Sequence, residues 1–440
     1  MNKKEQFVIE GLAGKKTLKG RVFINGAKNA ALKAMAASIL FDGEVTLNNI
    51  PDTEDIHVMK DILIDLGAKV RWQNNDQKSK IMKIDAREVS KTDIKTELAV
   101  KMRASVVLTG PMLTRFGKVS FPAPGGCVIG ARPIDLFIDG YKKMGATVEL
   151  RDGLYYIEAK NGLKGNEINF SKISVGGTET LMMAATLGRG RTILRNCAKE
   201  PEIGNVAEWL NACGANINGI GTDTLTIEGT GGKLLSPKNE YRAIPDRIEA
   251  GSFLILGALC AENLRIENCE PEHIQKTIDL LREAGVDISV ETNQSKSVIV
   301  SNSSKTRLKA FDVTTKEYPG FPTDLQAPLV VFLSQAEGES KVTETIFEGR
   351  FKYVEDLVNM GADIDTISQD QVLIKGPKAL KNLGKEKELS AHDIRAGFAI
   401  VLASLVGQGW SVVSNVYLID RGYESLEKKL QTLGASVVRR

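Results

Sequence analysis

A short motif occurs six times in this sequence: a glycine, a small residue, one variable residue, and then valine or isoleucine. The copies lie about 69 to 78 residues apart and begin at Gly67, Gly145, Gly214, Gly285, Gly361 and Gly434. A glycine after an amphipathic stretch is typical of the left-handed residue that ends a helix, and the apolar residue that follows starts a strand. Each copy therefore predicts a helix, a turn and a strand.

Upstream of each glycine the sequence predicts a small-residue helix, a strand, a loop and a second, amphipathic helix. These elements are 29–40, 45–48 and 55–66 in the first repeat, 248–260, 264–268 and 273–284 in the fourth, and 395–406, 411–414 and 424–433 in the sixth. Six βαβαβ-like units imply internal pseudo-symmetry. Because 440 residues exceed the size at which one core stops growing, we expect two compact domains of three repeats each.

The first helix of each repeat is apolar on all sides, as in segments 181–185 and 396–405. Such a helix is buried. The second helix, as in 353–358, is amphipathic and faces water on one side. The pattern predicts an inverted α/β arrangement, with buried helices inside and sheets outside.

The composition is that of a soluble globular enzyme, with 42% hydrophobic and 26% charged residues and a net charge of only +3. These totals do not indicate a surface for nucleic acid or for an anionic membrane. The chain shows no signal peptide, and its longest apolar stretches are far shorter than the ~20 residues that cross a bilayer. We expect a cytoplasmic protein, and the sequence carries no signal for its oligomeric state.

The cysteines and histidines are too dispersed to form a metal site. They are Cys127, Cys197, Cys213, Cys260, Cys269, His57, His273 and His392. We therefore expect free thiols in a reducing compartment and no bound metal.

Polar residues gather at equivalent places in the repeats. One set starts the buried helices and comprises Lys28 with Asn29, Arg103, 174–178, 246–249, Asp324 and 393–395. The other set follows the middle strand and comprises Asp55, 127–132, 200–202, 270–272, 348–350 and 420–421. By the symmetry of the repeats, both sets should emerge at the same end of their domain.

Several members of these sets are cations at helix starts, where lysine and arginine are unfavourable unless an anion meets them. They are Lys28, Arg103, Arg132, Arg247, Arg350, Arg395 and Arg421. Plain helix caps and structural ion pairs are the alternative for any one of the polar residues. The cluster favours a ligand with several negative groups, such as phosphates plus a carboxylate. The sequence contains neither a Walker A motif nor a dinucleotide fingerprint.

The loop 121–133 sets Cys127 among glycines and prolines, with Arg132 five residues on. A free cysteine is more often a small buried hydrophobe. Flanking glycines and prolines are instead typical of an exposed loop or lid, and a nearby cation tunes a thiol for chemistry. The pattern indicates a reactive cysteine.

Seven ordered motifs, spread over nearly the whole chain, resemble those of the UDP-N-acetylglucosamine 1-carboxyvinyltransferase family. They are 25–32, 102–105, 124–133, 245–249, 321–326, 343–351 and 420–424. The resemblance implies two domains of inverse α/β-barrel type, 28–244 against 1–27 plus 245–440, with the first strand joining the second half of the chain.

The resemblance also implies an activity. Members of this family transfer the enolpyruvyl group of phosphoenolpyruvate to the 3-hydroxyl of UDP-N-acetylglucosamine and release phosphate. This is the first committed step of peptidoglycan synthesis, hence of cell wall biogenesis, cell shape and cell division. No cofactor is implied, because phosphoenolpyruvate is a co-substrate. The resemblance does imply a possible covalent adduct on Cys127. The implied partners are these two small molecules, with no nucleic acid and no membrane.

The same resemblance implies roles for individual residues. Cys127 matches the acid and covalent cysteine, and Asp324 the group that deprotonates the sugar hydroxyl. Lys28, Arg132 and Arg421 would hold the phosphate, and Arg350 and Arg395 would face the carboxylate. The implied substrate contacts are Lys28, Asn29, Arg103, Arg132, Pro133, Ile134, Asp135, Leu136, Lys172, Ile173, Ser174, Val175, Asp324 and Ile346.

Three other functions compete with this prediction. The related 5-enolpyruvylshikimate-3-phosphate synthases have no cysteine in the lid loop, so Cys127 argues against them. A catalytically silent UDP-sugar-binding regulatory paralogue would not need Cys127, Asp324 and Asp393 together. An RNA-end-modifying enzyme of related architecture would need a histidine nucleophile in a suitable loop, and none of the three histidines lies in one.

Overall fold

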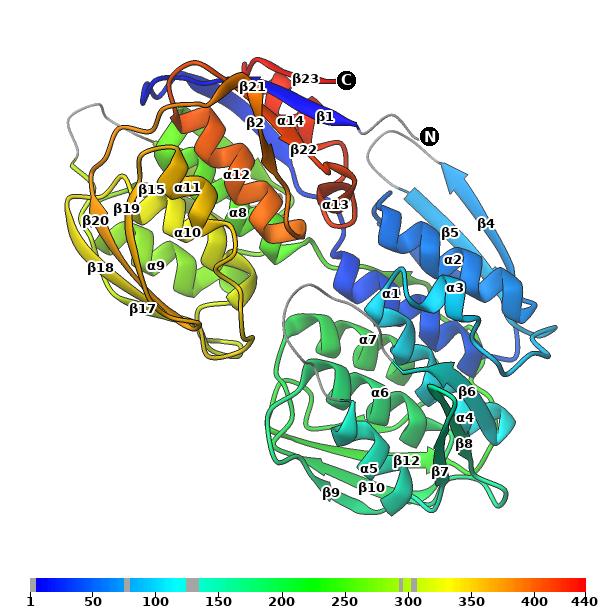
Figure 1. Cartoon of the computed structure of the whole chain (residues 1–440). Coiled ribbons are helices and arrows are strands. Elements are labelled where there is room, and N and C mark those ends of the chain that lie inside the picture. The colour runs from blue at the N-terminus through cyan, green and yellow to red at the C-terminus, as the bar shows by residue number, and fades with distance from the viewer. Residues whose placement is uncertain (1–4, 75–79, 124–133, 293–295, 302–306) are drawn as a thin grey trace. The chain divides into compact units, whose positions relative to one another are not determined.

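The computed structural model of the protein describes residues 5–74, 80–123, 134–292, 296–301 and 307–440. The chain divides into two compact units (Figure 1). We call the unit that spans 26–244 the central domain. The unit made of residues up to Asn25 and from Pro245 to Arg440 is the terminal domain, because it holds both ends of the chain. In the described part of the chain, the backbone passes between the two domains after Asn25 and after Ile244.

All six motif glycines adopt the predicted left-handed conformation, with φ angles between 93° and 110°. A side chain rarely adopts this conformation, which explains why glycine stands at each position. A strand begins two or three residues after each glycine, for example β4 (Lys69–Asn74) after Gly67. The predicted helix, turn and strand are therefore confirmed in every repeat.

In the described part of the chain, five of the six sheets share one plan: one edge strand is parallel to its neighbour, and the remaining pairs of neighbouring strands are antiparallel. In the central domain the sheets are β13(Tyr241–Arg242)-β3(Val45–Asn48)-β5(Lys80–Asp85)-β4, β6(Lys118–Pro122)-β8(Leu154–Glu158)-β7(Thr147–Arg151) and β11(Ile217–Asn218)-β12(Thr224–Thr230)-β10(Arg189–Arg195)-β9(Glu167–Asn169). The sheet of β6 has three strands, and a single parallel bridge between Asp93 and Ser120 stands in the place of the first strand.

The terminal domain repeats this plan three times. Its sheets are β15(Asp287–Glu291)-β16(Ser297–Ser301)-β14(Ala261–Glu267)-β2(Leu18–Phe23), β17(Val313–Thr314)-β18(Gly338–Thr343)-β20(Gln371–Gly376)-β19(Asp363–Ser368) and β21(Gly384–Ser390)-β22(Trp410–Ser414)-β1(Gln6–Glu10)-β23(Val437–Arg439). Strand β1 thus completes the sixth sheet and β2 the fourth, so the start of the chain pairs with strands of its second half.

The first helix of each repeat lies inside its domain, as predicted (Figure 1). These helices are α1(Lys28–Ala37), α4(Thr109–Phe116), α6(Val175–Thr186), α8(Arg247–Cys260), α10(Gln326–Leu333) and α12(Ile394–Val406). In the terminal domain α8, α10 and α12 contact one another. In the central domain α4 packs on α6. Each domain has its own continuous hydrophobic core, so the inverted α/β arrangement is confirmed.

The second helices bury one face and expose the other. They are α2(Glu54–Leu66), α5(Asp135–Lys143), α7(Pro201–Ala212), α9(Gln275–Glu283), α11(Val354–Asn359) and α14(Leu426–Thr432). Shorter helical segments are α3(Thr96–Ala99), α13(Tyr417–Asp420) and the 3₁₀ segments η1(Ser38–Leu40), η2(Arg103–Leu108), η3(Pro271–Ile274) and η4(Thr323–Leu325). The buried helices of the second and fifth repeats thus begin with tight 3₁₀ turns, which hold Arg103 and Asp324.

Candidate active site

Asp324 lies between two buried arginines of the terminal domain. Its Oδ1 accepts from Arg350 Nη2 at 3.0 Å and its Oδ2 from Arg395 Nη2 at 3.3 Å. Arg350 follows β18, and Arg395 stands in the first turn of α12. Only 7% and 6% of these two arginines is exposed to solvent. Such charge-assisted hydrogen bonds are strong because little water competes for them.

The start of α12 is built to present Arg395. The Asp393 carboxylate caps the helix by accepting from the backbone N–H groups of Arg395 and Ala396 at 2.7 and 3.0 Å. The Arg395 guanidinium lies 5.2 Å from the centre of the Tyr423 ring. The Tyr423 hydroxyl is 2.8 Å from Ser252 Oγ.

Arg395 keeps its charge and has donor capacity left. Burial lowers its pKa, but Tyr423 and the carboxylates of Asp324 and Asp246 outweigh burial, so the pKa lies above its ordinary value. Its Nη1 is buried and makes no hydrogen bond with the described residues. A buried unsatisfied donor is costly unless a ligand meets it. This atom is therefore suited to an oxygen of an anionic ligand.

Lys28 opens α1 in the central domain, as the sequence predicts. Its Nζ lies 2.9 Å from Asp55 Oδ2 at the start of α2, and both side chains are buried. Gly26, two residues before Lys28, is required by packing, because a Cβ on Gly26 would stand 1.7 Å from the carbonyl oxygen of Asn49. Lys28 and Asp324 belong to the polar set at the helix starts, and Asp55 and Arg350 to the set that follows the middle strands. The two sets thus meet in the pairs Lys28–Asp55 and Asp324–Arg350.

These contacts also correct one expectation. The cations at the helix starts were expected to need an external anion, yet Lys28, Arg350 and Arg395 have the carboxylates of Asp55 and Asp324 as counter-ions. Any anionic ligand of these cations must therefore compete with carboxylates of the protein.

Most of the other predicted contacts lie at or beside the starts of helices. In the central domain these are Asn29 in α1, Arg103 at the start of η2, Ile134, Asp135 and Leu136 at the start of α5, and Lys172, Ile173, Ser174 and Val175 at the start of α6. Ser174 caps α6, since its Oγ accepts from Gly177 N at 3.1 Å. In the terminal domain Ile346 follows β18 and Arg421 follows α13. Cys127, Arg132 and Pro133 lie outside the described residues.

Comparisons with known proteins agree over nearly the whole chain. The family described as EPSP synthase (3-phosphoshikimate 1-carboxyvinyltransferase) matches residues 12–430. Proteins named UDP-N-acetylglucosamine 1-carboxyvinyltransferase are 43% identical in Desulforapulum autotrophicum, over 97% of this chain and 98% of the relative, and 44% in Koribacter versatilis, over 99% and 96%. The Helicobacter pylori relative is 41% identical over 97% and 98%. The chain belongs to the UDP-N-acetylglucosamine 1-carboxyvinyltransferase family. This membership confirms the resemblance found in the motifs.

Solved structures share the fold of this chain. The enolpyruvyl transferase NikO from Streptomyces tendae superposes with a TM-score of 0.86, covering 99% of both chains at 24% identity. EPSP synthase from Acinetobacter baumannii gives a TM-score of 0.72, covering 99% of this chain and 100% of that chain at 17% identity. The prediction of an enolpyruvyl transferase fold is therefore confirmed.

A buried ion pair of the central domain was not predicted from the sequence. Lys33 in α1 and Glu179 in α6 lie 3.2 Å apart, and Glu179 is almost fully buried. Burial raises the pKa of Glu179 to about 7, although the Lys33 ammonium opposes this rise. The signal was a charged residue in the middle of each of two helices built largely from small and apolar residues.

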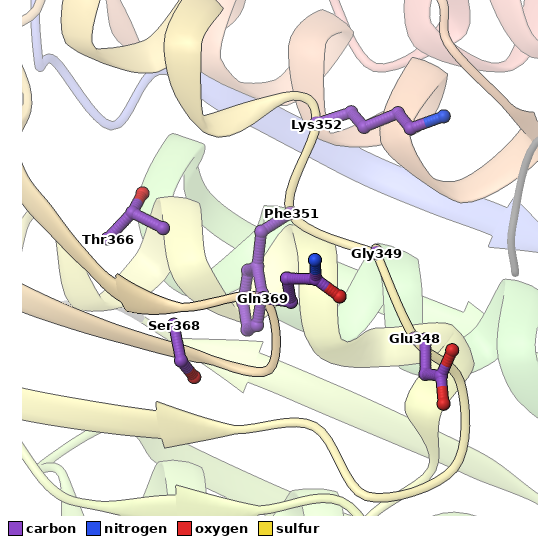
Figure 2. A pocket seen from close by; sticks show the side chains of 7 residues that line it. All are labelled: Glu348, Gly349, Phe351, Lys352, Thr366, Ser368 and Gln369. Carbon is purple, nitrogen blue, oxygen red and sulfur yellow. The ribbon is translucent and has the colours of Figure 1, made fainter.

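The terminal domain also has a surface hollow of about 540 Å³ beside the loop that carries Arg350. Figure 2 shows that the Glu348 carboxylate and the Lys352 ammonium at its rim point in different directions, while Ser368 and Gln369 come from the β19–β20 hairpin. Because no charged groups converge there, the hollow is not comparable to the cluster around Asp324.

Within the described ranges, no group of three His, Cys, Asp or Glu side chains could hold a metal ion. In the same part of the chain, no helix combines the length and the apolar character that a membrane crossing needs.

Proposed function

We propose that this protein transfers the enolpyruvyl group of phosphoenolpyruvate to the 3-hydroxyl of UDP-N-acetylglucosamine and releases inorganic phosphate. The observation that carries the proposal is the buried cluster in which Asp324 lies between Arg350 and Arg395. It combines a carboxylate that can take a proton with two cations that can hold an anion. The names of relatives that are 41–44% identical support the choice of donor and acceptor.

The reaction has an addition step and an elimination step. In the addition, the sugar oxygen attacks C2 of phosphoenolpyruvate while C3 gains a proton. In the elimination, C3 loses a proton and the bond between C2 and the phosphate oxygen breaks, which expels phosphate and restores the double bond. The protein must therefore supply a base for the hydroxyl, an acid for C3, and cations for the two anionic groups of the donor.

Each of these needs has a candidate residue. Asp324 takes the hydroxyl proton, and Cys127 protonates C3 and can carry the covalent adduct. Arg350 and Arg395 bind the donor carboxylate, with Arg395 Nη1 available for one of its oxygens. We assign the phosphate to Lys28, Arg132 and Arg421. When the carboxylate of phosphoenolpyruvate draws the guanidinium groups of Arg350 and Arg395 away from Asp324, the oxygens of Asp324 become available to accept the proton.

The remaining predicted contacts are assigned to the acceptor and its surroundings. They are Asn29, Arg103, Pro133, Ile134, Asp135, Leu136, Lys172, Ile173, Ser174, Val175 and Ile346. We further propose that the reaction serves peptidoglycan synthesis, and through it cell shape and division, in the cytoplasm.

Phosphate release from phosphoenolpyruvate tests the proposal. We expect release with UDP-N-acetylglucosamine and none with shikimate 3-phosphate. Cys127→Ala should abolish release, whereas the matched variant Cys197→Ala should retain it, because Cys197 is a buried thiol whose pKa burial raises to about 11. Release with neither acceptor would refute the proposal and favour a silent UDP-sugar-binding paralogue.

A further inference from the structure

The carboxylate of Glu344 organises the loop between β18 and Arg350. Glu344 directly follows β18 and is 3% exposed. Its Oε1 accepts from Thr315 Oγ1 at 2.9 Å and from the backbone N–H groups of Ile346 and Phe347 at 2.8 and 3.1 Å. Its Oε2 accepts from Thr323 Oγ1 at 2.8 Å. Four donors thus converge on one buried carboxylate, which fixes the position of the loop.

These bonds also fix the direction of a hydrogen-bond chain. An ionised carboxylate only accepts, and a threonine hydroxyl has a single proton to donate. Thr323 gives that proton to Glu344, so it offers a lone pair to Arg350 Nη1, which donates to it at 2.6 Å. The other terminal nitrogen of Arg350 donates to Asp324 at 3.0 Å. The chain therefore runs from Glu344 through Thr323 and Arg350 to Asp324.

We propose that Glu344 is a positioning residue for this reaction, an inference that rests on the proposed function. By orienting the Thr323 hydroxyl, it holds the Arg350 guanidinium in the plane and place where that group binds the donor carboxylate. Through the N–H groups of Ile346 and Phe347, it also sets the course of the loop that carries a predicted acceptor contact. Glu344 itself touches no reacting atom.

Glutamine at position 344 removes the constraint at nearly constant size, since its amide can donate to Thr323 as well as accept. We expect Glu344→Gln to raise the KM for phosphoenolpyruvate roughly tenfold, as for other residues that orient a binding group, with a smaller change in kcat. Thr323→Val should produce a similar rise. Thr323→Ser keeps the hydroxyl and should restore the wild-type KM. Glu339→Gln, an exposed carboxylate on β18, is the matched control and should leave both constants unchanged.

A double-mutant cycle distinguishes positioning from general stabilisation. If Glu344 acts through Thr323, Glu344→Gln should add little to the KM for phosphoenolpyruvate in a Thr323→Val background. The proposal would be overturned if the increases in KM of the two single variants multiplied in the double variant. A wild-type KM in Glu344→Gln would also overturn it. If Glu344→Gln does not fold, Thr323→Val and Thr323→Ser still test the chain, and equal KM values for these two would overturn it.

The proposed function can fail separately, and wild-type protein that releases no phosphate with UDP-N-acetylglucosamine would show this. In that case a crystal structure of Glu344→Gln tests whether Glu344 positions the Arg350 guanidinium. An unchanged contact between Arg350 and Asp324 would overturn the positioning role, whereas a displaced guanidinium would support it.

Discussion

At the scale of single residues, this protein holds buried and partly buried charged groups in pairs that join different helices. Lys28 pairs with Asp55, Lys33 with Glu179, and Lys429 with Glu249. Removing one partner of a buried pair is strongly destabilising, because the other charge is left in a medium of low dielectric constant.

Glu179 should make stability fall as pH rises. Its pKa is about 7 in the folded protein and near 4.3 in an unfolded chain, so folding favours the protonated form. The contribution is fully present below pH 4 and is lost as pH rises through 7. Each unit of pKa difference corresponds to about 1.4 kcal/mol, so the loss is on the order of 3–4 kcal/mol.

Denaturant unfolding from pH 5 to pH 8 measures this effect. The free energy of unfolding of Glu179→Gln, relative to wild type, should increase with pH over this interval. The exposed Glu208 of α7 provides the control, and Glu208→Gln should keep a constant difference from wild type. A pH-independent difference for Glu179→Gln would mean that Glu179 stays ionised when buried.

Asp324→Asn should leave binding largely intact and lower kcat by about 10²–10⁴-fold, the usual contribution of a general base. Asparagine preserves the shape of the side chain but cannot take the hydroxyl proton. Steady-state phosphate release measures the effect, with Asp365→Asn on the exposed face of β19 as the control. A kcat within a factor of three of wild type would remove Asp324 from the role of base.

At the scale of elements, glycine lets the buried helices approach closely. A Cβ on Gly110 of α4 would stand 2.3 Å from the carbonyl oxygen of Thr180 in α6. A Cβ on Gly140 of α5 would stand 2.3 Å from Leu181 Cδ1. The backbone atom in the first case cannot move aside, so α4 and α6 could not keep their present distance with any larger residue at 110.

Two glycine-to-alanine changes should therefore have opposite effects on stability. Gly110→Ala should lower the free energy of unfolding by about 1–3 kcal/mol or more, because it overpacks the contact with α6. Gly176→Ala, at the exposed start of α6 where no atom lies within 4 Å of the new Cβ, should raise it by roughly 0.5–1 kcal/mol through better helix propensity. Chemical denaturation measures both, and stabilisation by Gly110→Ala would contradict the close helix contact.

At the scale of the whole molecule, the two domains differ in how the chain builds them. Every strand of the central domain comes from within 26–244, including β13, which pairs with β3. The terminal domain needs both ends of the chain, because β1 lies between β22 and β23 and β2 pairs with β14. Phe7 and Ile9 of β1 are fully buried in its core.

A fragment of residues 26–244 should therefore fold alone, with a cooperative thermal transition followed by circular dichroism. A fragment of 245–440 should not, since it lacks two strands and leaves apolar surface open. Joining residues 5–25 to its C-terminus through a flexible linker should restore the transition. Cooperative unfolding of 245–440 without those residues would show that β1 and β2 are dispensable.

Local features of the sequence were enough to predict the repeats and the inverted fold. Two local signals carried the prediction: a left-handed glycine such as Gly67 and the pattern of an apolar helix such as α12. Each depends only on residues a few positions apart, and each occurs six times in the chain. The motifs around Lys28, Asp324 and Arg350 likewise predicted candidate site residues at the starts of helices and after the middle strands of the repeats.

The pairing of those side chains depends on packing and has no local signal. Lys33 meets Glu179, and Asp324 meets Arg395, only because the buried helices approach at a particular distance and rotation. The proposed role of Glu344 depends on two hydroxyls from other segments, that of Thr315 directly after β17 and that of Thr323 at the start of η4. Periodicity reports which face of an element is buried, whereas the partner of a buried charge is set by contacts between residues far apart in the chain.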